Sequence, residues 1–111
     1  MRTIKINQKS YNVPEFGFAQ MRAMEDNGFN VVEIVTKQKI FSIASAFVSV
    51  VVGCNAKDAD ILIEQHILGG GNIMDLCEAF AKATEESSFF KSLFGSKAEQ
   101  NQTGQKPQIV K

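Results

Sequence analysis

The sequence contains one histidine, His66, and so one imidazole for acid–base or metal chemistry. Asp58, Asp60 and Glu64 precede it, and the last two, four residues apart, would share one face of a helix. A metal site also needs a second nitrogen or thiolate ligand at ligand spacing, and the sequence around His66 offers none. We interpret this segment as a solvent-facing surface helix rather than a metal site or a general base.

A run of glycines, "GGGN" at 69–72, precedes a segment with a helical pattern. Backbone amides at a helix start can bind phosphate, but a phosphate loop follows a strand and carries a Lys-Ser/Thr pair. Here the run follows a predicted helix, Asn72 is the expected N-cap, and Asp75 places a negative charge where a phosphate would lie. We interpret the run as a turn between two helices.

The remaining nucleophiles give no catalytic pattern either. Cys54 and Cys77 are far apart and form no CxxC pair, so we expect two buried thiols without a disulfide. No serine has a nucleophile-elbow setting, and His66 has no evident orienting partner. The sequence therefore predicts a protein that is not an enzyme and that uses no cofactor or metal.

The charge balance argues against nucleic acid as a partner. Twelve basic and twelve acidic residues give no net charge at pH 7, whereas nucleic-acid binders carry a basic face. If the helices on either side of 69–72 formed a helix-turn-helix, the second would present Asp75, Glu78 and Glu85 to phosphates, with only Lys82 to offset them. We expect no binding to DNA or RNA.

Membrane insertion is not expected either. The start of the chain, "MRTIKINQKSYN", lacks the apolar core of a secretory signal. The longest apolar run lies in 40–52 and is interrupted by serines, and a bilayer needs roughly 20 apolar residues. These features predict a cytoplasmic protein.

The first element expected along the chain is a β-hairpin. Ile4 and Ile6 alternate with polar residues, and after "NQKS" Tyr11 and Val13 do the same. Pro14 cannot donate a hydrogen bond to a strand and should end the second one. An isolated hairpin is only marginally stable, so it must pack against the rest of the domain.

Helical patterns follow the hairpin. The first covers 15–26, where Phe18, Met21 and Met24 recur at helical spacing, and it should stop at Asn27-Gly28. Asn30, with Glu33 three residues later, predicts the cap of a short second helix. We interpret 39–52 as the central helix, ending at Gly53, although its valine-rich end is also compatible with a strand.

Two further helices are predicted in the second half. Asn55 caps the first, which ends at Gly69 and should bury Ile61, Leu62 and Leu68. Asn72 caps the second, whose apolar stripe comprises Ile73, Leu76, Phe80 and Ala83. The sequence thus predicts a mainly α, small helical domain with an N-terminal β-hairpin.

The end of the chain differs in composition. Residues 95–111 contain four glutamines, two glycines and one proline but no aromatic residue, and cannot bury enough surface to offset the entropy of ordering. We therefore expect one domain over 1–94, with a net charge of −2, and a disordered tail over 95–111, with a net charge of +2.

A phenylalanine-rich segment, "EESSFFKSLFG" at 85–95, joins the two parts. If Ser87 or Ser88 caps a final helical turn, one side of that turn becomes strongly apolar. That side carries Phe89, Phe90, Leu93 and Phe94. Small domains need their aromatic residues in the core, whereas an exposed cluster of this kind marks a site for another protein. The sequence leaves both interpretations open.

The order of these segments resembles the tail assembly chaperones of long-tailed phages and prophages of Gram-positive hosts. The resemblance covers about 1–94 and rests on the hairpin "IKINQKSYNV", the turn "MEDNGFNV", the apolar helix "FSIASAFVSVVVGC" and "GGGNIMDLCEAFAKATEESSFF". The last of these is the most specific. The family has no invariant catalytic motif, so the resemblance lies in the pattern of segments.

The resemblance implies a non-enzymatic protein that binds the aggregation-prone tape measure protein and helps load tail-tube subunits around it. The tail-tube protein is implied as a second partner, and a homo-oligomer is a further option. The position of Phe89, Phe90, Leu93 and Phe94 at the edge of the predicted fold makes them the expected partner residues. The resemblance also implies a protein of the bacterial cytoplasm that is absent from the mature virion. The alternatives are a structural tail protein of the virion that acts through oligomerisation and a small DNA-binding regulator.

Overall fold

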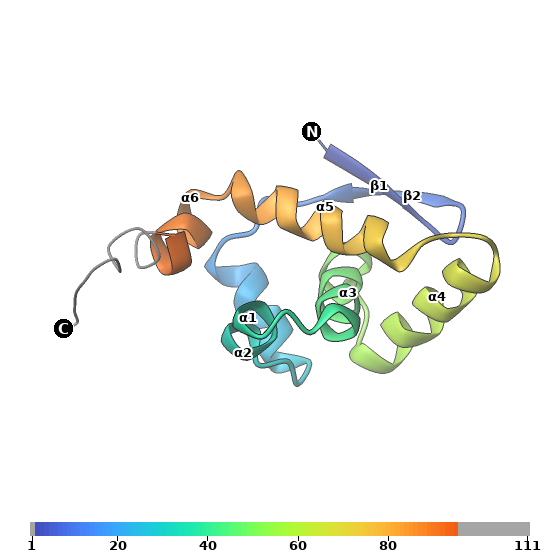
Figure 1. Ribbon diagram of the computed structural model, residues 1–111, viewed down its shortest axis with the longest axis horizontal. Helices are drawn as coiled ribbons and strands as arrows, with labels where there is room; N and C mark the ends of the chain where they lie inside the picture. The colour runs from blue at the N-terminus through green and yellow to red at the C-terminus, as the bar shows by residue number, and fades with distance from the viewer. Residues whose placement is uncertain (1, 96–111) are drawn as a thin grey trace.

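The computed structural model describes residues 2–95, and the expected disordered tail lies almost wholly outside this range. The elements, in chain order, are β1 (Arg2–Ile6), β2 (Lys9–Val13), α1 (Phe18–Asp26), α2 (Val31–Thr36), α3 (Ile40–Val48), a π-helical turn (Ser49–Gly53), α4 (Ala56–Leu68), α5 (Ile73–Glu85), α6 (Ser88–Phe90) and a second π-helical turn (Lys91–Gly95). The prediction of a mainly α domain with an N-terminal hairpin is confirmed (Figure 1).

The hairpin is tighter than the sequence suggested. β1 and β2 are antiparallel, with Ile4 opposite Tyr11, and Asn7 and Gln8 alone form the turn. Both turn residues have positive φ, 51° and 69°, as the type I′ turn requires. Lys9 and Ser10, which we assigned to the turn, belong to β2 because this turn matches the twist of the strands. β2 ends at Val13, directly before Pro14, as predicted.

Helix α3 lies at the centre of the molecule and packs against α2, α4 and α5 (Figure 1). Ala44, Ala46, Phe47 and Val48 are fully buried, and the two alanines let neighbouring helices approach closely. The valine-rich end continues as a π-helical turn and stops at Gly53, whose φ is 82°. The helical interpretation of 39–52 is therefore confirmed.

Phenylalanine rings form the middle of the core. Phe16 stacks on Phe47 at 5.9 Å between ring centroids and meets the edge of Phe80 at 5.7 Å. Phe80 in turn meets Phe90 at 6.2 Å. Phe16 precedes the first residue of α1 and is nevertheless fully buried. The linker between the hairpin and α1 thus supplies a central core residue.

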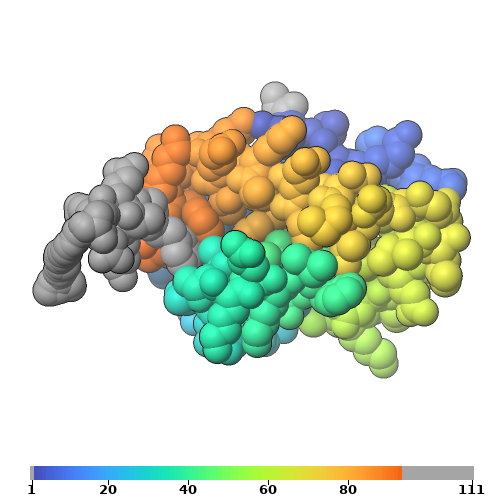
Figure 2. Space-filling view, viewed as in Figure 1, coloured from blue at the N-terminus to red at the C-terminus, as the bar shows by residue number. Residues whose placement is uncertain are grey.

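Helix α5 crosses one face of the molecule, above α2 (Figure 2). Leu76, Phe80 and Ala83 are buried and Ile73 is half-buried, so the predicted stripe is confirmed. On the opposite side of α5, Glu78 and Lys82 face solvent. The exposed carboxylate of Glu86, just after α5, pairs with Arg2 of the hairpin.

Helix α4 buries a different face from the one we predicted. Ala59 and Ile63 face the core, whereas Ile61 and Leu68 are 46% and 79% exposed and Leu62 is half-buried. α4 lies at one end of the molecule (Figure 1), where it packs against α3, the turn after α3 and strand β1. Its two buried residues, Ala59 and Ile63, are four apart and so form a narrow stripe along the helix.

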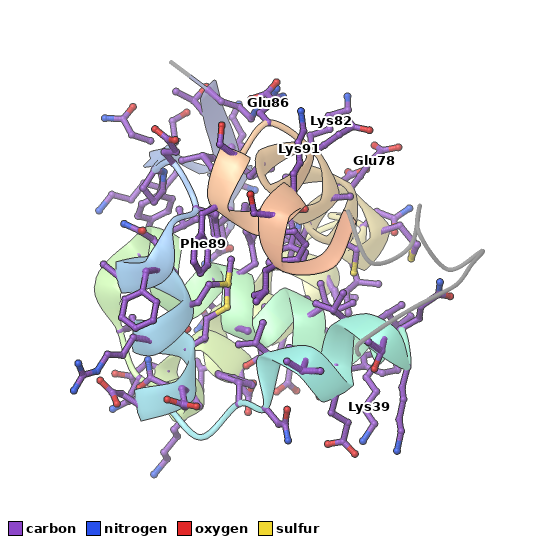
Figure 3. The ribbon with its side chains drawn as sticks, turned by 90° about the vertical axis from the view of Figure 1, so that its left-hand side faces the viewer. Lys39, Glu78, Lys82, Glu86, Phe89 and Lys91 are labelled. Carbon is purple, nitrogen blue, oxygen red and sulfur yellow. The ribbon has the colours of Figure 1, made fainter. Side chains whose placement is uncertain are left out.

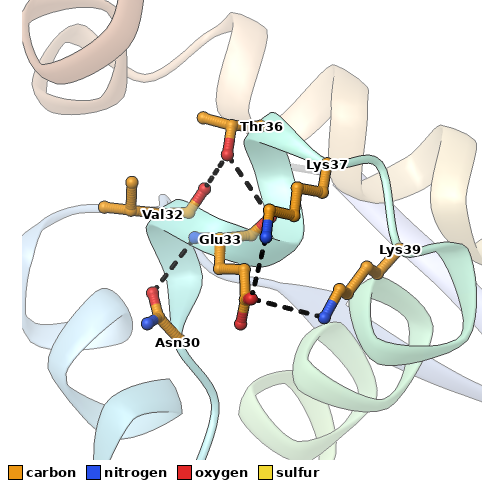
Figure 4. A network of polar contacts seen from close by, with 6 residues as sticks. All are labelled: Asn30, Val32, Glu33, Thr36, Lys37 and Lys39. Atoms are coloured by element: carbon orange, nitrogen blue, oxygen red, sulfur yellow. Dashed lines mark hydrogen bonds and ion pairs between the residues drawn. The ribbon is translucent and has the colours of Figure 1, made fainter.

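The helix starts agree with the predicted caps. The side-chain oxygens of Asn30, Asn55 and Asn72 accept hydrogen bonds from backbone amides two or three residues later, at 2.8–3.0 Å. At α2, the Glu33 carboxylate also contacts the ammonium groups of Lys37 and Lys39, at 3.3 and 3.5 Å (Figure 4). The short helix α2 is thus stabilised by Asn30 at its start and by the contacts of Glu33 with Lys37 and Lys39 at its end.

Within residues 2–95, no single helix has both the length and the apolar composition to cross a membrane. Ile40–Gly53 and Ala56–Leu68 reach that length and composition only as a pair, with a bend of 105° between them.

Candidate binding groove

His66 connects the hairpin to α4. Its Nδ1 accepts a hydrogen bond from the backbone N–H of Asn7 at 2.9 Å, and the neighbouring Gln65 Oε1 accepts one from Asn7 Nδ2 at 3.0 Å. Asp58, Asp60 and Glu64 are exposed, as expected of a surface helix, but the His66 imidazole is half-buried, which corrects the interpretation for this residue alone. The reason is tertiary: the hairpin turn packs over the end of α4, and its backbone amide needs an acceptor.

The other polar residues near His66 form no metal site. Asp60 accepts a hydrogen bond from the Ser45 hydroxyl at 2.6 Å. Among the described residues, no group of three or more His, Cys, Asp or Glu side chains is placed to hold a metal ion. The glycine run joins α4 to α5, as predicted, and Gly71 lies directly against the His66 ring.

Both cysteines are free and half-buried, which makes them more exposed than we expected. Burial raises the pKa of the Cys77 thiol, and burial together with the nearby Asp58 carboxylate raises the pKa of the Cys54 thiol. A raised pKa reduces the thiolate fraction at neutral pH, which is the opposite of what a nucleophilic cysteine needs.

An apolar concavity lies at the end of the molecule formed by α1, α2 and α6. It has a volume of about 790 Å³. α1 contributes one wall through Phe18, Met21, Arg22 and Glu25, which recur at helical spacing and so share a face. Phe89 and Leu93, four residues apart, line it from α6 and the turn that follows, and the residues around Val32 line it from the start of α2. We call this the α1–α6 groove.

The four predicted partner residues are divided between this groove and the core. Phe89 is half-buried and lies between α6 and α1 (Figure 3), where its ring meets the edge of Phe18 at 6.0 Å. Leu93 is 41% exposed. Phe90 is buried against Phe80, so the core interpretation holds for this residue. The side chain of Phe94 lies outside the described part of the chain.

Phe18, the aromatic residue with the most exposed surface in the groove, was not among the predicted partner residues. We grouped Phe18 with Met21 and Met24 by their helical spacing, but Phe18 is 66% exposed while both methionines are buried. Phe16 occupies the core position instead, two residues earlier. The pattern Phe16-Gly17-Phe18 held a clue, because Gly17 is the N-cap and separates a linker residue from a helix residue.

Charged residues mark the other end of the groove. Glu25 and Asp26 occupy the last turn of α1, where there is no basic residue, and Arg22 lies one turn earlier. None of these three side chains belongs to an ion pair within residues 2–95. The groove is therefore apolar at the Phe18–Phe89 end and charged, with a net negative rim, at the other.

Comparisons of this chain with protein-family models, with curated proteins and with solved structures give no match.

Proposed function

We propose that this protein is a non-enzymatic phage tail assembly chaperone that holds an apolar helical segment of a tape measure protein in the α1–α6 groove. One observation carries the proposal: the exposed ring of Phe18 lies beside Phe89 and Leu93 in an apolar groove between helices. Exposed apolar surface of this kind marks a protein-binding site. The choice of a tape measure protein rests on the resemblance described above.

The dimensions of the groove suit a short helix. α1 has nine residues, which corresponds to a length of roughly 13 Å at 1.5 Å per residue. A partner helix of two to three turns would match that length and present anchors at i, i+3 or i+4, and i+7, the usual spacing for recognition of a helix in a groove. Phe18, Phe89 and Leu93 would contact those anchors.

The expected energy of the two aromatic anchors is large enough to measure. Burying a fully exposed aromatic side chain contributes about 2 kcal/mol. Because Phe18 is 66% exposed and Phe89 is half-buried, the two together would contribute about 2 kcal/mol, or roughly thirtyfold in affinity. The function needs no cofactor or metal, since it depends on apolar contact alone.

The proposal includes where the protein acts. A chaperone of this kind works in the cytoplasm of the bacterial host before the tail is complete and leaves the assembled particle. The tail-tube protein is a second proposed partner, because it must be loaded around the tape measure protein.

The test is the double variant Phe18→Ser with Phe89→Ser, co-expressed with a tape measure protein from the same phage or prophage. We expect the tape measure protein to become insoluble while the variant keeps its melting temperature within a few degrees. The matched control is Phe41→Ser, because Phe41 is 72% exposed and lies on α3, outside the groove. The control should keep the tape measure protein soluble.

A folded double variant that still keeps the tape measure protein soluble would contradict the proposed role of the groove. Phe90→Ser serves as a second comparison. Because Phe90 is buried against Phe80, we expect this variant to lose stability itself, by about 3 kcal/mol or more. Loss of binding in that variant alone would reflect unfolding rather than a contact with the partner.

One observation favours the alternative of a structural tail protein that oligomerises. Phe41, Leu68 and Met74 are 72%, 79% and 50% exposed on α3, α4 and α5, outside the groove. A virion component would co-purify with finished particles, whereas a chaperone would be absent from them. Detection of this protein at stoichiometric amounts in purified tails would favour the structural role.

A further inference from the structure

The charged end of the α1–α6 groove carries two carboxylates, Glu25 and Asp26, and one cation, Arg22. Glu25 and Asp26 are exposed in the last turn of α1, and the C-terminal end of a helix is the negative end of its dipole. Within residues 2–95 neither carboxylate takes part in an ion pair. With Arg22 included, this end of the groove has a net charge of −1, so a further cation brought here would interact favourably with that charge and with the helix dipole.

The chain leaves the described structure at the same groove. Leu93 lines the groove, and the turn that contains it ends at Gly95 (Figure 1). Residues 96–111 follow, with three lysines and one glutamate. Their only large aliphatic residues are Ile109 and Val110, which lie between Lys106 and Lys111. An apolar pair with basic flanks is thus tethered beside an apolar groove with an acidic rim.

The tether is long enough to return to the groove. Thirteen residues lie between Gly95 and Ile109, and a random coil of that length has an end-to-end distance of roughly 20 Å. The short dimensions of the molecule are 27 and 24 Å. A tether of this kind gives an effective concentration on the order of millimolar, at which even a weak anchor is bound for much of the time.

We propose that residues 106–111 of the same chain bind in the α1–α6 groove and cover it until a partner displaces them. Pro107 favours an extended backbone, in which adjacent side chains point to opposite sides. Ile109 and Val110 would then contact the α1 wall and the α6 wall, while Lys106 and Lys111 approach the Glu25 and Asp26 carboxylates. The inference rests on the proposed function, since the tail covers the surface assigned to the tape measure protein.

Such a cover acts as a competitor. If the groove is open in one tenth to one third of the molecules, the apparent affinity for a partner falls by roughly three- to tenfold. A long apolar helix with several anchors overcomes this competition, whereas a weak or accidental apolar contact does not. The tail would thus restrict the groove to strong partners and limit self-association of the free protein.

The experiment compares the full chain with its double variant Ile109→Ser, Val110→Ser by amide NMR. We expect shifts at Phe18, Arg22, Val32 and Leu93, around the groove, and none at Phe41 or Leu68. The matched control is Gln105→Ser with Gln108→Ser, which changes the same tail but keeps Ile109 and Val110. Its groove amides should have the same chemical shifts as those of the wild-type chain. A second pair, Lys106→Gln with Lys111→Gln, should weaken docking, and added salt should weaken it similarly.

Two measurements separate this inference from the proposed function. The first is dilution: groove shifts that depend on protein concentration would assign the contact to another copy and overturn the proposal. The second is binding of a synthetic amphipathic helical peptide from a tape measure protein, which should be three- to tenfold tighter for the Ile109→Ser, Val110→Ser variant. If the peptide binds both chains equally, or if the Ile109→Ser, Val110→Ser variant shows no chemical-shift changes around the groove, the tail inference is wrong and the proposed function is unaffected. If the groove amides shift but the peptide binds neither chain, the proposed function is wrong and the tail inference stands.

Discussion

At the scale of single residues, the contact between His66 and Gly71 shows how closely the hairpin end of the molecule is packed. A Cβ atom at position 71 would lie 2.3 Å from His66 Nε2 and about as close to two ring carbons. The ring cannot turn aside freely, because its Nδ1 accepts the hydrogen bond from Asn7. Glycine is therefore required at 71 for space.

We predict that Gly71→Ala destabilises the protein by about 1–3 kcal/mol, the usual cost of overpacking. Urea denaturation measures the change. In a His66→Ala background the same substitution should cost much less, because the atoms it would strike are gone. An equal cost in both backgrounds would show that the His66 ring is not the obstacle.

Glu33 gives a prediction for pH. The Lys37 ammonium, hydrogen-bonded to the Glu33 carboxylate, and the nearby Lys39 lower the pKa of this carboxyl. A carboxyl with a lowered pKa in the folded state stabilises the fold above its unfolded pKa, and the contribution is lost as pH falls through the folded pKa. Glu33→Gln should therefore melt below the wild type at pH 7 at low salt. The two melting curves should converge in acid and at high salt, and a difference that persists after the Glu33 carboxyl is protonated would contradict the ion-pair explanation.

At the scale of elements, α6 is a single helical turn whose position depends on one hydroxyl. Ser87 is fully buried; its oxygen accepts a hydrogen bond from the Phe90 backbone N–H at 3.1 Å, and its O–H donates to the Phe16 carbonyl. This residue therefore caps α6 and also ties it to the linker before α1. Because Phe89 follows two residues later, Ser87 also sets one wall of the groove.

We predict that Ser87→Ala lowers the free energy of unfolding by about 1–3 kcal/mol, because it leaves a buried carbonyl and a helix-terminal amide without partners. Ser88→Ala is the control, since Ser88 is the exposed neighbour and should change stability by less than about 0.5 kcal/mol. Thermal melting of the two variants makes the comparison. If both melted alike, the hydroxyl of Ser87 would have no special role.

At the scale of the whole molecule, stability comes from one apolar core shared by the hairpin and the helices. Ile6 and Val13 of the hairpin, Phe16 of the linker, Phe47 of α3 and Phe80 of α5 belong to the same buried cluster. Both cysteines are free thiols. The hairpin is therefore held by the helices rather than by a covalent link.

We predict that neither a chelator nor a reductant changes the melting temperature by more than about a degree. The cluster that holds the described residues together is apolar and contains neither a disulfide nor a three-ligand metal group. Differential scanning calorimetry with EDTA and with dithiothreitol provides the measurement. A drop of many degrees with either reagent would mean that a bound metal or a disulfide contributes to folding.

The local features of this fold were determined by the sequence alone. Caps at Asn30, Asn55, Asn72 and Ser87 depend on hydrogen bonds within three residues, so the residue types are sufficient to predict them. The end of β2 before Pro14 and the helical nature of 39–52 have the same local origin. The sequence also indicated the Phe-rich segment that lines part of the proposed groove, because four large apolar residues cluster there.

Tertiary packing alone decided which of those apolar residues face the core. In "SFF", Phe89 and Phe90 are adjacent and differ by about 100° around a helix, so periodicity cannot say which one packs on Phe80. The same holds for Phe16 against Phe18 and for Ile63 against Ile61, where the sequence offers two similar side chains for one buried place. That choice depends on the direction from which another element approaches, and the side chains left outside at α1 and α6 form the groove.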